Sequence, residues 1–150
     1  MTSGGVWLGI DPGAVRIGVA VSDPGASIAV PVETVKRGKH DVARICTIAQ
    51  EKAAVGIFVG LPRSMSGAEG QAAGVARSFA EQVARTCPIP VRLLDERLTT
   101  VSAARGLRES GRSSRSSRAV IDQAAATVLL QAALDQMAAS GSVVGELVPA

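Results

Sequence analysis

Aromatic side chains are nearly absent from this sequence. It has two Phe, one Trp and no Tyr among 150 residues, although 47% of its residues are hydrophobic. A core of this composition must be built from Val, Leu, Ile and Ala, which is typical of an α/β sheet covered by Ala-rich helices. The scarcity of rings also argues against a protein that holds single-stranded bases by stacking them on aromatic side chains.

Cysteine and histidine are equally scarce. Cys46 and Cys87 lie far apart and show no CxxC spacing, so the sequence supports neither a zinc site nor a thioredoxin-like motif. We expect both to be reduced thiols. His40, the one histidine, falls in a predicted loop, and we interpret it as a solvated surface residue.

Long hydrophobic runs and a targeting signal are also missing. No run is long enough to cross a membrane, and residues 1–5 have neither a basic start nor an apolar segment. We therefore expect a cytoplasmic protein without a membrane partner. The length predicts one domain over residues 1–138, with a tail at 139–150 that shows no pattern. The net charge is +3 and most of the positive charge is arginine, which favours a phosphate-bearing partner.

Apolar periodicity and turn signals predict alternating strands and helices after an initial meander. Strands are expected at 8–11, 16–22, 28–35, 55–60 and 91–94, and helices at 41–54, 72–83, 99–107 and 119–137. Pro31 marks the third strand as an edge strand, because proline cannot donate a hydrogen bond to a neighbour. The order predicts an α/β fold: a mixed five-stranded sheet, its first three strands antiparallel, with helices on both faces.

Three acidic residues fall at the ends of these elements. Asp11 ends the first strand, Glu96 follows the fifth, and Asp122 lies in the first turn of the last helix. Right-handed crossovers let these strand ends open on the same side of the sheet. Clustered carboxylates repel one another unless cations neutralise them, and oxygen ligands suit Mg²⁺ or Mn²⁺. The pattern indicates metal-assisted phosphoryl chemistry, which needs no nucleophilic side chain; the alternative for Asp11 is a simple turn cap.

Four blocks of sequence, in this order, resemble one family over roughly residues 6–134. They are Asp11-Pro12-Gly13 with Arg16 to Ala20, Val59-Gly60-Leu61-Pro62, Asp95-Glu96-Arg97-Leu98-Thr99-Thr100, and Ile121-Asp122 with Ala125-Ala126. Together they are similar to the YqgF/RuvX family of RNase H-like nucleases. The resemblance implies an RNase H-like fold and divalent-metal-dependent hydrolysis of phosphodiester bonds. It also implies a substrate that is either the precursor of small-subunit ribosomal RNA or branched DNA, the Holliday junction of recombination.

The resemblance assigns roles to the acids. Asp11, Glu96 and Asp122 match the family's acidic triad and would be both catalytic and metal-binding. Asp95 is the alternative to Glu96. Adjacent strand residues point to opposite faces, and the sequence does not show which of the two faces the site. The last helix has alanine one turn after Asp122, where the wider superfamily has a second acid, so a second metal is expected to bind weakly or only with substrate.

Arginines surround these acids. Arg16 and Arg97 are interpreted either as ion-pair partners of neighbouring carboxylates or as phosphate contacts. Further arginines recur at steps of three or four residues in the Ser-rich stretch before Asp122, and we expect them to bind phosphate because guanidinium forks suit phosphate oxygens. They are Arg105, Arg108, Arg112, Arg115 and Arg118.

Two choices stay open. The sequence does not separate RNA from DNA, nor a monomer from the homodimer that symmetric cutting of two strands would need. A catalytically weak nucleic-acid-binding module is the alternative function. An actin-like ATPase or sugar kinase would need two such lobes, and 150 residues supply one.

Overall fold

The computed structural model describes residues 4–64, 66–98 and 115–150, with the backbone alone at 98 and 115–121. The strands are β1 (Val6–Pro12), β2 (Arg16–Ser22), β3 (Ala29–Lys36), β4 (Ala54–Leu61), β5 (Val91–Asp95) and β6 (Glu146–Leu147). The helices are α1 (Asp41–Glu51), α2 (Gln71–Thr86) and α4 (Arg115–Ser140), and η1 (Glu96–Leu98) is a short 3₁₀ helix.

One mixed sheet has the strand order β3-β2-β1-β4-β5-β6. The first three strands are antiparallel, and β1, β4 and β5 run parallel, as the sequence predicts. The prediction of five strands is wrong, because the tail adds β6, which pairs antiparallel with Arg92 and Leu93 of β5. A strand of two residues is too short to show the alternation by which strands are recognised in a sequence.

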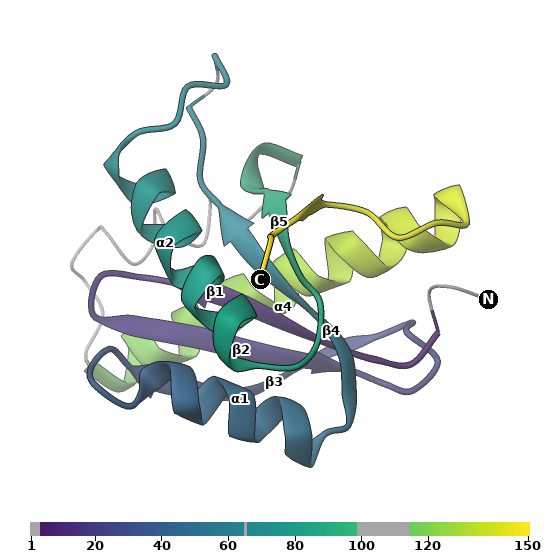
Figure 1. Cartoon of the computed structure of the whole chain (residues 1–150), viewed down its shortest axis with the longest axis horizontal. Coiled ribbons are helices and arrows are strands. Elements are labelled where there is room, and N and C mark those ends of the chain that lie inside the picture. Colours follow the sequence, from purple (N-terminus) through teal and green to yellow (C-terminus); the bar gives the residue numbers. More distant parts are fainter. Residues whose placement is uncertain (1–3, 65, 99–114) are drawn as a thin grey trace.

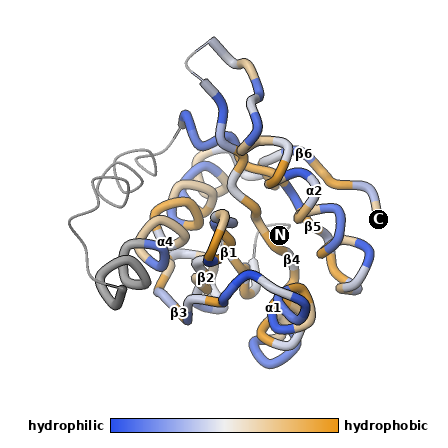
Figure 2. The backbone as a smooth tube through the Cα atoms, turned by 90° about the vertical axis from the view of Figure 1, so that its left-hand side faces the viewer, coloured by the Kyte–Doolittle hydropathy of each residue, from blue (hydrophilic) through white to orange (hydrophobic). Residues whose placement is uncertain are grey.

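Helices cover both faces of the sheet (Figure 1). Residues of α1 and α2 pack with Leu8 and Ile10 of β1 in one apolar cluster. Residues of α4 pack with Trp7 of β1 and Phe58 of β4 in a second cluster on the opposite face. Figure 2 shows the hydrophobic strands enclosed between these two layers. Because side chains alternate along a strand, Asp11 projects toward the α4 face, like Trp7.

The strand that contains Pro31 is an edge strand, as predicted: β3 has a neighbour on one side, β2, and begins the strand order. Pro31 is exposed. The pairing between β2 and β3 skips a residue near it, since Val19 pairs with Glu33 and the next residue, Ala20, pairs with Pro31. A bulge of this kind accommodates the missing N–H.

The last helix begins at Arg115, earlier than the apolar stripe predicts. Arginine and serine have adequate helix propensity, so a helix nucleated by its packed part extends into a segment without an apolar face. The helix expected at 99–107 lies outside the described residues. Within the described ranges, no helix is long and apolar enough to cross a membrane.

Cys46 and Cys87 form a disulfide, contrary to the expectation of two reduced thiols. Cys46 lies in α1 and Cys87 follows the last residue of α2; they are 41 positions apart in the sequence, and 5.4 Å separates their Cα atoms. The spacing in the sequence says nothing about this contact, because it arises from the packing of α1 against α2 on one face of the sheet.

Candidate active site

Asp11 lies at the end of β1 between two glycines of neighbouring strands. Its direct partner across β2 is Gly18. On the other side, Ile10 pairs with Val59, so Asp11 aligns with the next residue of β4, Gly60. All three positions face α4, because Phe58 of β4 packs in the α4 cluster and alternation turns Gly60 the same way. Glycine at both positions leaves the space beside the Asp11 carboxylate open to other groups.

The main chain of Asp122 occupies the space above Gly18. A Cβ on Gly18 would collide with the carbonyl group of Asp122. Asp122 is the eighth residue of α4, not a residue of its first turn as the sequence predicts, because the helix begins at Arg115. This part of α4 rests directly on β2, and the absence of a side chain on Gly18 permits the close approach. The contact brings Asp122 to the same end of the sheet as Asp11.

The side chain of Glu96 occupies the space above Gly60. A Cβ on Gly60 would lie 2.5 Å from Oε1 of Glu96. Glu96 begins η1, directly after β5. The three acids therefore lie on one face of the sheet, at the end where β1 and β5 finish. All are buried: the exposed fraction is 0% for Asp11, 5% for Glu96 and 1% for Asp122.

Arg16 is an ion-pair partner of Asp122. Its Nε donates a hydrogen bond of 3.1 Å to Oδ2 of the carboxylate. Arg16 begins β2, two residues before Gly18, so it lies on the same face. A buried carboxylate needs a cation or several hydrogen bonds, and Arg16 supplies a positive charge at the acidic site.

Asp95 points away from this site. Leu93 belongs to the α1/α2 cluster and Leu94 to the α4 cluster, so alternation sends Asp95 to the face opposite Glu96. There Asp95 accepts a hydrogen bond of 2.6 Å from Nη2 of Arg97. This bond is the main reason that the pKa of Asp95 is lower than usual.

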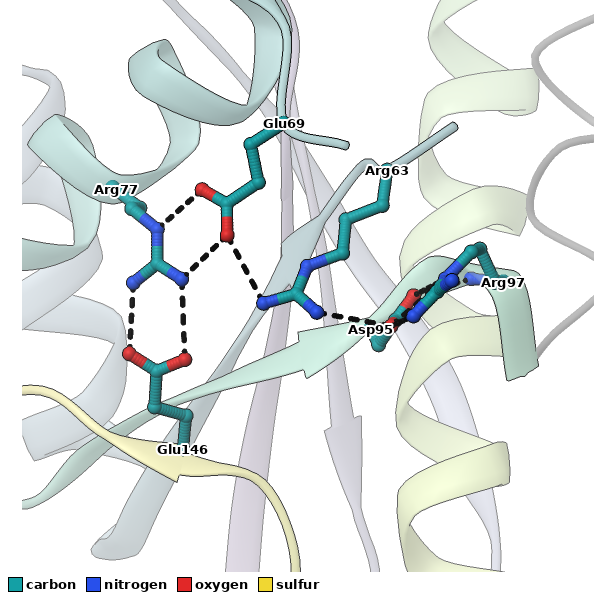
Figure 3. A network of polar contacts seen from close by, with 6 residues as sticks. All are labelled: Arg63, Glu69, Arg77, Asp95, Arg97 and Glu146. Atoms are coloured by element: carbon teal, nitrogen blue, oxygen red, sulfur yellow. Dashed lines mark hydrogen bonds and ion pairs between the residues drawn. The ribbon is translucent and has the colours of Figure 1, made fainter. Parts of the chain in front are cut away.

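The Asp95–Arg97 pair belongs to a network of alternating charges (Figure 3). Arg63 contacts Asp95 and donates to Glu69, and Arg77 donates to both Glu69 and Glu146. These residues come from the segment after β4, from α2, from the end of β5 and from the tail. The network, which we call the charge network, links the long connection between β4 and α2 to the end of β5 and to the tail. Its members are Arg63, Glu69, Arg77, Asp95, Arg97 and Glu146.

The donor chemistry at the site suits a hard divalent cation, since it consists of carboxylate oxygens. Among the residues that the structure describes, however, no three acidic, histidine or cysteine side chains are grouped closely enough to hold one ion. Mg²⁺ commonly takes one or two carboxylates and completes its shell with water and substrate phosphates. The residues therefore fit an ion that assembles its site together with substrate.

Most of the other arginines predicted to bind phosphate have no described side chain. Arg105, Arg108 and Arg112 lie outside the described residues. Arg115 and Arg118 lie in α4, where the structure describes the backbone and not their side chains.

Sequence reasoning missed the part played by Gly18 and Gly60 in making room for the acids. The signal was present, because glycine inside a buried strand often marks a close approach of another group.

A mixed sheet of this strand order, with buried acids at the end where β1 and β5 finish, defines an α/β fold of the RNase H-like class. The solved structure of Thermus thermophilus RuvC has this fold, with a TM-score of 0.55, 19% sequence identity and coverage of 93% of this chain and 99% of RuvC. The same protein in complex with a Holliday junction substrate gives a TM-score of 0.54 at 19% identity, covering 94% and 99%. At this identity the likeness establishes the fold.

Sequence comparison establishes the family. The sequence model of the RuvX family, described as a Holliday junction resolvase, matches residues 5–136. Curated relatives named "Putative pre-16S rRNA nuclease" include one from Nocardioides sp. (strain JS614), 55% identical over 150 residues, and one from Thermobifida fusca (strain YX), 53% identical over 152 residues. In both cases the match covers 96% of each chain. This chain therefore belongs to the RuvX family.

Proposed function

We propose that this protein is a divalent-metal-dependent endonuclease that hydrolyses phosphodiester bonds in the precursor of small-subunit ribosomal RNA. One observation carries the proposal: three buried carboxylates lie on one face of an RNase H-like sheet, at the end where β1 and β5 finish. They come from β1, from the start of η1 and from α4. The names of the curated relatives support the choice of RNA.

Asp11, Glu96 and Asp122 would hold Mg²⁺ or Mn²⁺. A bound divalent ion stabilises charge on phosphoryl oxygens and lowers the pKa of the attacking water. Asp11 aligns with Gly18 and Gly60, which lie under Asp122 and Glu96, so its carboxylate would hold the ion together with these two acids. Arg16 orients Asp122 through its hydrogen bond. Arg97 directly follows Glu96 in the sequence and is paired with Asp95, so it would have to leave that pair to contact substrate phosphate.

A second candidate function is cleavage of branched DNA. The description of the matching family model as a Holliday junction resolvase favours it. Symmetric cutting of a junction would require a two-fold homodimer, whereas trimming of one RNA strand would not. A binding module with little catalysis is the third reading, supported by Ala125 and Ala126 standing where a further acid would follow Asp122.

The test is cleavage of two labelled substrates, an extended small-subunit ribosomal RNA precursor and a four-way DNA junction, with Mg²⁺ or Mn²⁺. Asp11→Asn should abolish cutting, with a loss of at least about a hundredfold, because charge stabilisation is usually the largest single contribution to catalysis. Asp135→Asn is the matched control, since Asp135 is exposed on the same helix as Asp122. Cutting of RNA that survives Asp135→Asn and disappears in Asp11→Asn supports the proposal. Cutting of DNA alone would select the second function, and binding without cutting would select the third.

A further inference from the structure

A basic loop lies against the turn that follows Asp11. The loop is residues 37–40, which connect β3 to α1. The backbone N–H of Arg37 donates to the carbonyl of Val15, and its Nη1 donates to the carbonyl of Gly13 at 3.0 Å. Gly13 and Val15 belong to the β1–β2 turn. The loop is thus at the same end of the sheet as the acids. It lies on the face covered by α1 and α2, whereas the acids lie on the face covered by α4.

Beside this loop the surface is hollowed between the start of α1 and the outer side of α2. Two adjoining hollows share Gly38, Asp41 and Gln82. The first reaches Ala14 at the tip of the β1–β2 turn, and the second reaches Arg85 near the end of α2. Together they form a path that starts at the turn after Asp11 and runs along α2. We call this path the basic groove.

The basic groove carries positive charge that has no ion-pair partner in the part of the chain that the structure describes. Lys39 and Arg85 line it and both are exposed. In the described part of the chain, neither of them takes part in an ion pair. Most other arginines of that part are paired with carboxylates: Arg16, Arg37, Arg44, Arg63, Arg77 and Arg97.

Among the described residues that line the groove, the acid is Asp41, and its charge is already neutralised. Asp41 is buried, and its carboxylate accepts hydrogen bonds from Nε of Arg37 and from the backbone N–H groups of Gly38 and Val42. The first amides of α1 are therefore occupied by the protein itself, and what the groove offers a ligand is side-chain charge. Arg37 is fixed from its other side by Phe79, whose ring centre is 5.0 Å from the guanidinium carbon.

We propose that the basic groove binds the sugar-phosphate backbone of the RNA substrate on one side of the cut. The proposal rests on the proposed function, since it extends the path of the strand from the acids past the β1–β2 turn. Lys39 and Arg85 would contact phosphates, and Gln82 offers an amide between them. Positive charges spaced along a groove suit a polyanion and carry no base sequence. The exposed Val75 and Ala14 form apolar walls against which sugars can pack.

The test measures binding of a fluorescein-labelled RNA hairpin with single-stranded extensions to the full chain, by fluorescence anisotropy in EDTA at several salt concentrations. Each phosphate contact to a single strand contributes about 0.7 to the slope of log affinity against log salt. Lys39→Gln and Arg85→Gln should each weaken binding on the order of fivefold at about 0.1 M salt and reduce the slope by about 0.7. Lys52→Gln is the matched control, because Lys52 is an exposed lysine at the opposite end of α1.

The outcomes separate the groove from the nuclease. Losses in Lys39→Gln and Arg85→Gln, with Lys52→Gln within about twofold of wild type, support the groove. Equal losses in all three variants would show a general charge effect and overturn it. Unchanged affinity and slope in the two groove variants, while cleavage still depends on Asp11, would overturn the groove and leave the proposed function standing. A loss seen with the same hairpin made of DNA and not with RNA would overturn RNA as the occupant. Failure of the wild type to bind the RNA in EDTA would overturn the groove, while the proposed function is tested separately by cleavage with Mg²⁺.

Discussion

Arg16 and Asp122, 106 positions apart in the sequence, are joined by a hydrogen bond of 3.1 Å at the acidic site. The side chain of Asp122 is 2% exposed and that of Arg16 is 20% exposed. The pair ties the start of β2 to the eighth residue of α4 and gives the site a positive charge of the protein's own. A divalent ion bound there would share or replace Arg16 as the partner of Asp122.

Substitution of Arg16 should therefore make the free energy of unfolding depend more strongly on Mg²⁺. Without Mg²⁺, Arg16→Gln should lower the free energy of unfolding by about 1 to 3 kcal/mol, because a buried carboxylate loses a charged hydrogen-bond partner. Added Mg²⁺ should restore more stability to this variant than to wild type. Urea unfolding in EDTA and in Mg²⁺ measures both effects. Arg44→Gln, which breaks the exposed pair with Glu33, is the control and should respond to neither. Equal Mg²⁺ effects in wild type and Arg16→Gln would contradict the shared role.

The two glycines beside Asp11 should respond differently to alanine. Gly60→Ala places a Cβ against the end of the flexible Glu96 side chain, which can move aside. We expect a change in stability of less than about 1 kcal/mol and a loss of cleavage of about tenfold or more, because Glu96, which we propose as a metal ligand, would be displaced. Gly18→Ala places a Cβ against the main chain of α4, which cannot yield without moving the helix. It should cost about 1 to 3 kcal/mol in stability. Thermal unfolding beside cleavage assays separates the two; loss of folding in Gly60→Ala would refute this reading.

Much of this site could be predicted from strand ends. Asp11 ends an apolar run and precedes a Gly turn, and the position of Pro31 indicates the edge strand correctly. The choice between Asp95 and Glu96 could not be derived, because β5 is covered on both faces and its apolar run hides the alternation. The structure turns the two residues to opposite faces. Neither β6 nor the disulfide could be predicted, since each depends on contacts between segments distant in the sequence.

The disulfide yields a prediction of its own. Thiol titration of the purified, air-exposed protein should detect no free cysteine until it is unfolded in reductant. Closing a loop of 41 residues restricts the unfolded chain, which corresponds to about 3 to 4 kcal/mol of stability in the chain-entropy model. Reductant should therefore lower the unfolding temperature of wild type. The Cys46→Ser/Cys87→Ser double variant is the control and should be insensitive to reductant. Two titratable thiols in the native protein would contradict the disulfide.

The charge network should make stability depend on acid pH. Hydrogen bonds from Arg77 are the main cause of the lowered pKa values of Glu69 and Glu146, and those from Arg97 are the main cause for Asp95. A carboxyl group whose pKa is lower in the folded than in the unfolded protein stabilises the fold above its unfolded value, 4.5 for Glu and 3.8 for Asp. That stabilisation is lost as the pH falls from there through the folded pKa.

Arg77→Gln removes this cause for Glu69 and Glu146, so its stability should fall less steeply than that of wild type below pH 4.5. At neutral pH the difference between the two proteins should be small, because exposed ion pairs are screened by solvent. Arg92→Gln is the control: Arg92 donates to the carbonyl of Gly145 and has no carboxylate partner among the described residues. Urea unfolding as a function of pH measures the slopes. If Arg77→Gln and wild type lose stability in parallel as the pH falls, the network does not hold the carboxyl groups in their charged form, and the connection between β4 and α2 must be fixed by its backbone contacts instead.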